Sequence, residues 1–396
     1  MALSTREQHL LALVGAVMNN KKAPLPADTD WEQLFADGVI HAVPLLVFEG
    51  AAPYKSNIDP ALYATQQQRG YRRLLKNQQV NAAQQELVSL LEQEGYPYVI
   101  LKGAAAAAYY PKPQLRALGD VDFLIDPAQT QQLADRLEQA GYTKFMENHA
   151  CHLVFRKPGA HLEMHFEPAG IPHGEAGELA RAFLQDAVRQ PVKEEGFLAP
   201  LPHHHGLILL LHMQHHMVGE GLGLRHLCDW AAFVGKTHGQ PFWQQTLIPF
   251  LQKIGLFTYM NIMTAVCVTY LGTEQPQWLQ PIDPKLAQQV MEDIMLSGNF
   301  GRKDKKRAAS GMMVSNHGKD GTSHSKVYYL YQALHRSTLE QHAVARRSKA
   351  AAFCLDCGRA ARYLFNAARG KRYSPLALMP VAEKRKKLYE SFNLFK

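Results

Sequence analysis

The spacing of hydrophobic positions changes several times along the chain, and each change predicts a different kind of element. Over residues 1–94, apolar side chains recur three and four positions apart, the period of amphipathic helices, until Gly95 ends the pattern. From residue 98 they come in short runs closed by glycine or proline, which is typical of buried strands. Beyond Pro202 the helical period returns. The pattern therefore predicts helices on both sides of a mixed segment.

The mixed segment predicts a compact α/β unit. Strands are expected at 98–101, 121–125, 142–146, 152–156 and 161–166, and helices at 104–108 and 129–139. Lys157-Pro158-Gly159-Ala160 supplies a turn between the last two strands. The predicted fold class is α+β, with a small mixed sheet in an α/β core that is flanked by N- and C-terminal helical regions.

Four regions follow from this pattern. They are a helical region at 1–77, the α/β domain at 78–200, a helical domain at 201–296, and a linker with a basic helical region at 297–396. Helices of the third region are expected at 207–217, 224–234 and 284–295, and in pieces between 242 and 270. The polar stretch 297–325, rich in glycine and serine, is expected to be a flexible loop or linker.

Composition places the chain among folded proteins. Of 396 residues, 46% are hydrophobic and 20% charged, which excludes wholesale disorder. No apolar run approaches the roughly 20 residues of a transmembrane helix, and the first residues lack a secretory signal pattern. The five cysteines are scattered, which suits a reducing compartment. We expect a cytoplasmic protein without a transmembrane segment.

Charge is distributed unevenly along the chain. Residues 301–396 hold 21 Lys and Arg against 6 Asp and Glu, whereas residues 1–300 have a net charge of −7. A basic C-terminal region suggests contact with nucleic acid or an anionic surface, although a solvated basic helix is the simpler alternative. Aromatic residues that alternate with this charge could stack on bases or could belong to a core: Tyr328, Tyr329, Tyr331, Tyr363, Phe365 and Tyr373, near Arg346, Arg347 and Lys384–Lys387.

Carboxylates gather on two of the predicted strands. Asp120, just before the strand expected at 121–125, and Asp122 within it lie two residues apart and so point to the same face. Alternation likewise places Glu163, His165 and Glu167 on one face of the later strand. If the strands are neighbours, Glu163 adds a third carboxylate to a site for Mg²⁺ or Mn²⁺. A solvated strand edge is the alternative.

A glycine turn precedes this acidic strand. Lys102-Gly103 links the first strand to the helix expected at 104–108, and backbone N–H groups of such a turn can hold phosphate. Together with two metal ions about 4 Å apart, these are the minimal parts of nucleotidyl transfer. Arg116 could clamp a phosphate through two nitrogens or could form an ion pair with the acids.

The order of these motifs resembles the DNA polymerase beta-like nucleotidyltransferase superfamily, and more narrowly a bacterial family of uncharacterised nucleotidyltransferases. The resemblance rests on Leu101-Lys102-Gly103, Tyr110-Pro111, Arg116, Gly119-Asp120-Val121-Asp122 and Leu162-Glu163-Met164-His165-Phe166. It extends to Leu210-Leu211-His212 with His216 and to Leu224–Asp229, and thus covers about residues 30–235.

The resemblance implies transfer of a nucleoside monophosphate from a nucleoside triphosphate, ATP among the candidates, to an unidentified acceptor hydroxyl with release of pyrophosphate. By the same resemblance, Asp120, Asp122 and Glu163 would hold the metal, and Glu163 would also orient or deprotonate the acceptor. The residues that would bind the nucleotide are Lys102, Gly103, Arg116, His165, His212 and His216.

Several alternatives stay open. Ala104 replaces the second glycine or serine that usually follows the turn, which favours a nucleotide-binding or scaffold protein without turnover whose basic region engages a partner. A member that modifies RNA or protein is a third possibility. Histidines are dense at 203–205, 212, 215 and 216, and His212 and His216, which share one helix face, could bind zinc, line the cleft or cap a helix face. Arg225 and Asp229 are expected to form an ion pair, and Cys354 and Cys357 to lack a metal role.

Overall fold

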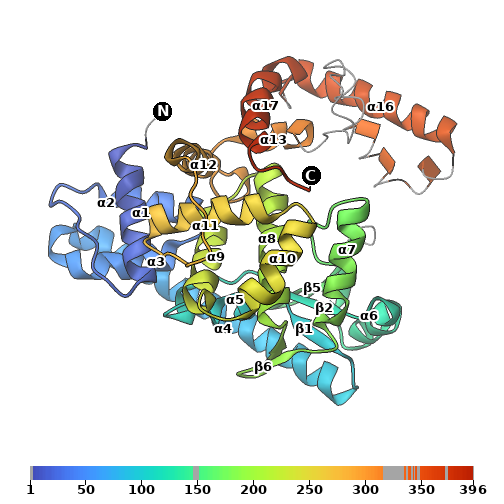
Figure 1. Cartoon of the computed structure of the whole chain (residues 1–396), viewed down its shortest axis with the longest axis horizontal. Helices are drawn as coiled ribbons and strands as arrows, with labels where there is room; N and C mark the ends of the chain where they lie inside the picture. The colour runs from blue at the N-terminus through green and yellow to red at the C-terminus, as the bar shows by residue number, and fades with distance from the viewer. Residues whose placement is uncertain are drawn as a thin grey trace.

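The computed structural model describes residues 3–145, 151–314, 348–370 and 373–395, with 334–335, 338–339, 342 and 344–345 between them. The described elements form an α+β protein in which one small mixed sheet is flanked by helices, and this confirms the predicted class. Figure 1 shows the sheet in the lower half of the molecule, the N-terminal helices to one side and the C-terminal helices at the top.

The N-terminal part consists of four helices. Their bounds are α1 (Thr5–Met18), α2 (Trp31–Ile40), α3 (Pro44–Ala51) and α4 (Pro60–Gln93), with a short 3-10 turn at Ala52–Asn57. Helix α4 begins where Asp59 accepts a hydrogen bond from the Leu62 N–H and Pro60 occupies the first turn. It runs without a break through residue 77, where the sequence pattern placed a region boundary.

The sheet has the strand order β1-β2-β5-β4-β3. Its strands are β1 (Tyr98–Ile100), β2 (Val121–Ile125), β3 (Thr143–Phe145), β4 (His152–Lys157) and β5 (Ala160–His165). Strands β2 and β5 are parallel, and the other three neighbouring pairs of this sheet are antiparallel. All five predicted strands are confirmed within one or two residues, except that Met146, predicted to end one of them, lies outside the described residues.

Strand β2 lies between two hydrophobic cores. Phe123 belongs to the core that the sheet forms with α4 and with α6 (Thr130–Gln139). Leu124 belongs to a larger core that joins α1–α3 to the helices after residue 200. Because successive side chains of a strand point to opposite faces, Asp120 and Asp122 share the face of Leu124. The acidic pair is thereby directed toward the helical body.

The helical body follows a short helix and a hairpin. These elements are α7 (Glu175–Leu184), β6 (Val192–Glu194), β7 (Phe197–Ala199), α8 (Pro202–Val218), α9 (Leu224–Thr237), α10 (Ile248–Lys253), α11 (Phe257–Leu271) and α12 (Pro284–Ser297). Leu207–Leu211 of α8 are all buried, as are Trp230 of α9 and Met263 of α11. The β6–β7 hairpin was not predicted, because its strands are only three residues long and two of the three residues of β6 are charged.

The C-terminal part contributes three described helices, α13 (Lys305–Val314), α16 (Lys349–Ala368) and α17 (Pro375–Glu390). Helix α13 and the turn at Asn299–Gly301 lie inside 297–325, so the predicted flexible loop is wrong for this part, and 315–325 lies outside the described residues. The helix was missed because residues 305–314 lack a clear apolar stripe.

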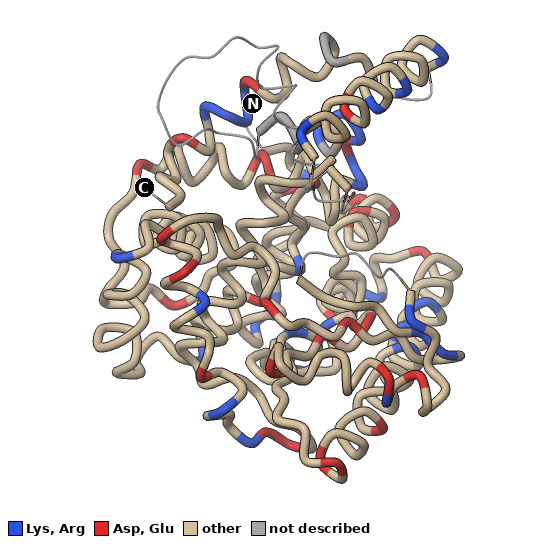
Figure 2. Tube along the Cα trace, turned by 90° about the vertical axis from the view of Figure 1, so that its right-hand side faces the viewer, with Lys and Arg blue, Asp and Glu red and all other residues tan. Residues whose placement is uncertain are grey.

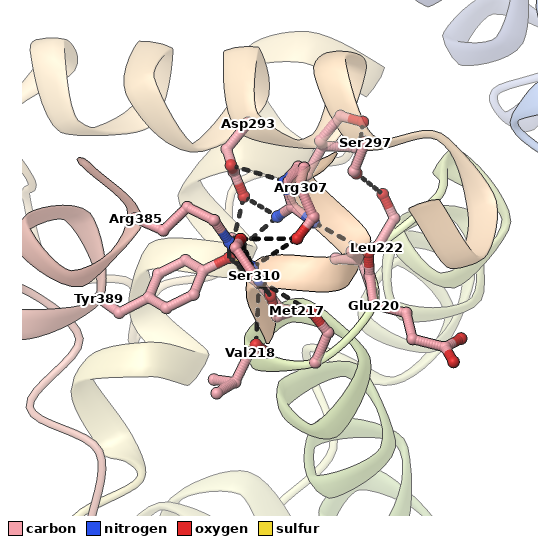
Figure 3. A network of polar contacts seen from close by, with 12 residues as sticks. Met217, Val218, Glu220, Leu222, Asp293, Ser297, Arg307, Ser310, Arg385 and Tyr389 are labelled. Carbon is pink, nitrogen blue, oxygen red and sulfur yellow. Dashed lines mark hydrogen bonds and ion pairs between the residues drawn. The ribbon is translucent and has the colours of Figure 1, made fainter. Parts of the chain in front are cut away.

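A buried arginine network fastens α13 and α17 to the body (Figure 3). From α17, Arg385 donates to the backbone carbonyls of Met217, Val218 and Gly219 at 3.1, 2.9 and 2.9 Å. It also donates to the carbonyl of Arg307, whose own guanidinium pairs with Asp293. The last carbonyls of α8, which have no partner within the helix, are thus satisfied by the C-terminal region.

No helix in the described part of the chain combines the length and the apolar character needed to cross a membrane. All five cysteines are described, and none forms a disulfide.

Candidate functional site

A pocket of about 250 Å³ lies between the edge of the sheet and helices α8 and α9. All nine residues singled out from the sequence line it: Lys102, Gly103, Arg116, Asp120, Asp122, Glu163, His165, His212 and His216. The pocket wall also includes Arg225, His226 and Phe300, which the sequence pattern did not assign to the site. Residues more than a hundred positions apart are therefore assembled at one place.

The third carboxylate arises from strand pairing. Asp122 of β2 is the register partner of Glu163 of β5 in the parallel pair, which confirms that the two acidic strands are neighbours. One ligand atom each of Asp122, Glu163 and His165 lies within 4.8 Å of the others. Hard divalent cations take oxygen ligands from such clusters. Glu167, which the strand pattern placed on the same face, does not belong to this cluster. It lies beyond the end of β5 and pairs with Arg181.

Two cationic side chains hold the Asp122 carboxylate. Lys102 Nζ lies 2.7 Å from Asp122 Oδ1, and His165 Nε2 lies 3.0 Å from the same oxygen. Burial raises the pKa of Asp122, but Lys102 and His165 lower it more, so the carboxyl is ionised well below its usual range. Burial lowers the pKa of His165, but its hydrogen bonds to Asp122, Cys151 and Glu163 together outweigh this and raise the pKa to about 10. The described site is a compact ionic cluster.

The pKa of Asp120 is shifted in the opposite direction to that of Asp122. Burial, followed by the negative charges of Asp122 and Glu163, raises the pKa of Asp120 to about 6. Like charges that are crowded in a partly buried site disfavour simultaneous ionisation. A divalent cation would relieve this repulsion, and the donor set is carboxylate oxygen, so the residues fit Mg²⁺ or Mn²⁺.

The glycine turn has a conformation that suits its predicted place. Gly103 has φ 60° and ψ −115°, a region that residues with a Cβ rarely adopt. The helix that follows it, α5 (Ala104–Ala107), has only four residues, so any phosphate contact comes from the turn itself more than from a helix dipole. The turn and the carboxylates line the same pocket.

Arg116 forms an ion pair, but its partner differs from the expected one. Its Nε and Nη2 donate to the two carboxylate oxygens of Asp229, both at 2.8 Å, and Tyr110 Oη donates to Asp229 Oδ1 at 2.6 Å. Arg116 and Asp229 are 6% and 4% exposed. The Nε–Nη2 edge of the guanidinium, one of the two edges that could clamp a phosphate, is therefore occupied. The predicted Arg225–Asp229 pair is replaced by this one.

Because Asp229 pairs with Arg116, Arg225 does not form the expected ion pair and instead lines the pocket. Its Nε is buried and has no hydrogen-bond partner among the described residues. Its guanidinium carbon lies 5.7 Å from the ring centre of Phe300. Burial, and then the positive charge of Arg116, lowers the pKa of Arg225. A partly buried guanidinium on the pocket wall has the charge and the donors to bind an anion there.

Three histidines form the helical wall of the pocket. His212 and His216 are one turn apart on α8, and His226 comes from the start of α9. Their ring centres lie 4.4 to 5.2 Å apart. Burial, with Lys102 and Arg225 adding to it, lowers the pKa of all three well below 6.5, so the rings are neutral near pH 7.

The other histidines of the dense segment lie elsewhere. His205 contacts Tyr109 Oη through Nδ1 at 3.1 Å, and His203 and His204 pack against Phe183. Only His215 of the remaining set reaches the pocket wall. The sequence segment therefore divides into residues that line the cleft and residues that pack in the body.

Some of the basic residues of the C-terminal region are buried and bind groups of the protein itself. Figure 2 shows Lys and Arg in the upper part of the molecule, where Figure 1 places α13, α16 and α17. However, Arg307 and Arg385 are only 2% and 3% exposed, and they bind carboxylate and carbonyl groups of the protein. Cys354 and Cys357 lie exposed on α16. Some residues predicted to meet a partner lie outside the described residues: Tyr328, Tyr329, Tyr331, Arg346 and Arg347.

A family model described as uncharacterised nucleotidyltransferase matches residues 27–272. The matched range contains the whole sheet, the pocket residues from Lys102 to His226, and helices α8 and α9. It ends before the C-terminal helices. Comparison with curated proteins and with solved structures gave no match.

Proposed function

Because the chain belongs to this family of uncharacterised nucleotidyltransferases, we propose that its pocket transfers a nucleoside monophosphate from a nucleoside triphosphate to an acceptor hydroxyl. The proposal rests chiefly on the register of Asp122 with Glu163, which unites three carboxyl groups beside the Lys102-Gly103 turn. In the reaction, the acceptor oxygen bonds to the α-phosphorus. The bond from that phosphorus to the bridging oxygen breaks, and pyrophosphate leaves.

The residues have complementary roles in this proposal. Mg²⁺ or Mn²⁺ held by Asp120, Asp122 and Glu163 would stabilise negative charge on the phosphoryl oxygens. Glu163 accepts the acceptor's hydroxyl proton at a carboxylate oxygen or orients that hydroxyl.

The triphosphate is held by the opposite charges of the pocket. Lys102 and the backbone of Gly103 meet the phosphates, and Arg225 takes the phosphate-binding role first predicted for Arg116. Arg116 instead orients Tyr110 and Asp229 beneath the site. His165 is a positioning residue through its bond to Asp122, and His212 and His216 form a wall of the nucleotide cleft.

The test is calorimetric titration of ATP, GTP, CTP and UTP in Mg²⁺, with pyrophosphate release in the presence of cell extract. Asp120→Ala/Asp122→Ala is expected to abolish both binding and release. Asp135→Ala is the matched control, since Asp135 is exposed on α6 and bonds only the nearby Gln131 in the described contacts. Nucleotide binding that survives in the double variant would overturn the proposed site.

A second candidate is nucleotide binding without turnover. It is favoured by the ion pair between Lys102 and Asp122, which supplies a protein cation where a metal ion would sit, and by Ala104 after the turn glycine. This candidate predicts binding of a triphosphate without pyrophosphate release under any acceptor supply. Contact with nucleic acid and a cytoplasmic location stay predictions.

A further inference from the structure

The three neutral imidazoles on the helical wall meet at one point. One ring nitrogen each of His212, His216 and His226 lies within 4.8 Å of the others. Two come from successive turns of α8 and the third from α9, and both helices are anchored in the larger hydrophobic core. Their relative positions are thus fixed by rigid elements and not by loops.

Three of these ring nitrogens lack the protein partners that buried imidazoles normally have. His226 is 2% exposed, and neither of its nitrogens has a hydrogen-bond partner within the described part of the chain. His212 Nδ1 is likewise buried and unpartnered there. A neutral imidazole carries one N–H donor and one lone pair, and burying both without partners is unfavourable. This arrangement calls for a ligand among the three rings.

We propose that His212, His216 and His226 form a binding site for a transition-metal ion of the zinc class, separate from the carboxylate site. Neutral imidazole is a preferred ligand of such ions, whereas carboxylate oxygen suits Mg²⁺. Ligands about 2.0–2.1 Å from a tetrahedral ion are roughly 3.4 Å from one another. Small side-chain rotations would bring the three nitrogens to that spacing.

Three protein ligands leave a fourth position of the ion open. All three rings line the pocket, so that position faces the same space as the carboxylates and the Lys102-Gly103 turn. Three-histidine sites with an open position hold water, hydroxide or a substrate oxygen. Because Lys102 and Arg225 lie near these rings and disfavour a bare cation, we expect an anionic oxygen as the fourth ligand.

The experiment uses the full chain, stripped of metal with a chelator and titrated with Co²⁺ in the absence of nucleotide. One Co²⁺ bound by three imidazoles and oxygen should give strong visible absorption, while octahedral oxygen ligation at the carboxylates gives weak bands. On the same wild-type sample, proton NMR should show three exchangeable, paramagnetically shifted imidazole N–H signals. Absence of these signals at saturating Co²⁺ would overturn the site without any variant being needed.

Variants then assign the ion to the histidines. His226→Asn should lower Zn²⁺ affinity by more than the roughly 10- to 100-fold that loss of an outer-shell partner costs, and should abolish the strong bands. His203→Asn, on the same α8 but packed against Phe183, should leave them unchanged. Asp122→Asn should also keep the bands. Bands that vanish in Asp122→Asn but persist in His226→Asn would place the ion on the carboxylates and refute the proposal.

This outcome is independent of the proposed transfer reaction, which is measured by Mg²⁺-dependent nucleotide binding. A protein that binds nucleotide but holds no Co²⁺ at the histidines refutes only the histidine site. A protein that binds Co²⁺ at the histidines but no nucleotide refutes only the transfer proposal.

Discussion

Lys102 Nζ lies 2.7 Å from Asp122 Oδ1, so a lysine from the glycine turn neutralises the carboxylate that is central to the site. Both side chains are largely buried, at 13% and 6% exposure. A substitution that removes the charge of Lys102 or of Asp122 would leave the other residue without its main partner. Lys102 therefore has two roles in the proposed reaction, to stabilise Asp122 before a metal arrives and to meet phosphate afterwards.

Replacing Lys102 separates these roles. In Lys102→Met, Asp122 loses its competing cation, so Mn²⁺ affinity without nucleotide should rise about 5- to 10-fold, while triphosphate affinity in Mg²⁺ should fall at least 10-fold. Calorimetry with Mn²⁺ alone and with nucleotide measures both. Lys112→Met, which removes a more exposed lysine paired with Glu49, is the control. Weaker Mn²⁺ binding in Lys102→Met would show that the lysine does not compete with metal.

In the protein without metal, Asp120 itself contributes more to stability in acid than near neutrality. Its pKa is raised to about 6 from the ordinary 3.8, so the folded state holds a proton that the unfolded state has lost between these values. The stabilisation is complete below about pH 4 and disappears as the pH rises through about 6. Asp120→Asn should thus raise the free energy of unfolding by about 1–2 kcal/mol at pH 7.5, and by less at pH 5.

Urea denaturation in chelator at the two pH values measures this difference. Asp135→Asn, a change at an exposed carboxyl, should leave the free energy of unfolding unchanged at both. If Asp120→Asn destabilises the protein equally at pH 5 and 7.5, the charge crowding inferred for the carboxylates is wrong.

The sheet and its acids could be predicted because their signals are local. Gly119 and Pro127 frame β2, and the pattern of apolar residues between them fixes which face Asp120 and Asp122 share. The Asp122–Glu163 pairing needed only the assumption that two strands are neighbours. The fold class and the strand positions followed from the same local patterns.

The helical wall of the site could not be predicted in the same way. Asp229 pairs with Arg116, 113 positions away, and not with Arg225 on its own helix, a choice that depends on how α9 packs against the sheet. His226 follows Arg225 in the segment Leu224–Asp229, where the charges suggested an ion pair between Arg225 and Asp229. Nothing in that segment indicated that His226 would lie beside His212. Single-helix spacing carries no information about contacts between helices.

The two arginines near α9 should respond differently to the same substitution. Arg116→Met leaves Asp229 buried without its cation and should cost about 3–5 kcal/mol of stability. Arg225→Met leaves no hydrogen-bonded acid behind, so it should cost less than about 1 kcal/mol while lowering triphosphate affinity at least 10-fold. Chemical denaturation and nucleotide calorimetry on both variants test this. Arg116→Met/Asp229→Leu should recover most of the lost stability, and failure to recover would contradict the ion-pair role.

Arg385 connects the C-terminal region to the pocket through the end of α8. Its Nη2 donates to the carbonyls of Met217, Val218 and Gly219, one to three residues after His216 of the histidine wall. In Arg385→Met these carbonyls lose a charged donor, so the last turn of α8 should open more often. Hydrogen exchange should then accelerate at the amides of Gly219 and Gly221, which bond the carbonyls of residues 215 and 216.

Nucleotide affinity should fall by several-fold in the same variant, because His216 loses its fixed position while no pocket residue is changed. Lys384→Met removes an exposed charge from the same helix and should alter neither exchange nor affinity. Unchanged exchange at Gly219 and Gly221 in Arg385→Met would mean that α8 holds its last turn without the C-terminal helix. A fall in affinity with unchanged exchange would instead indicate that α17 acts on the nucleotide by another route than the histidine wall.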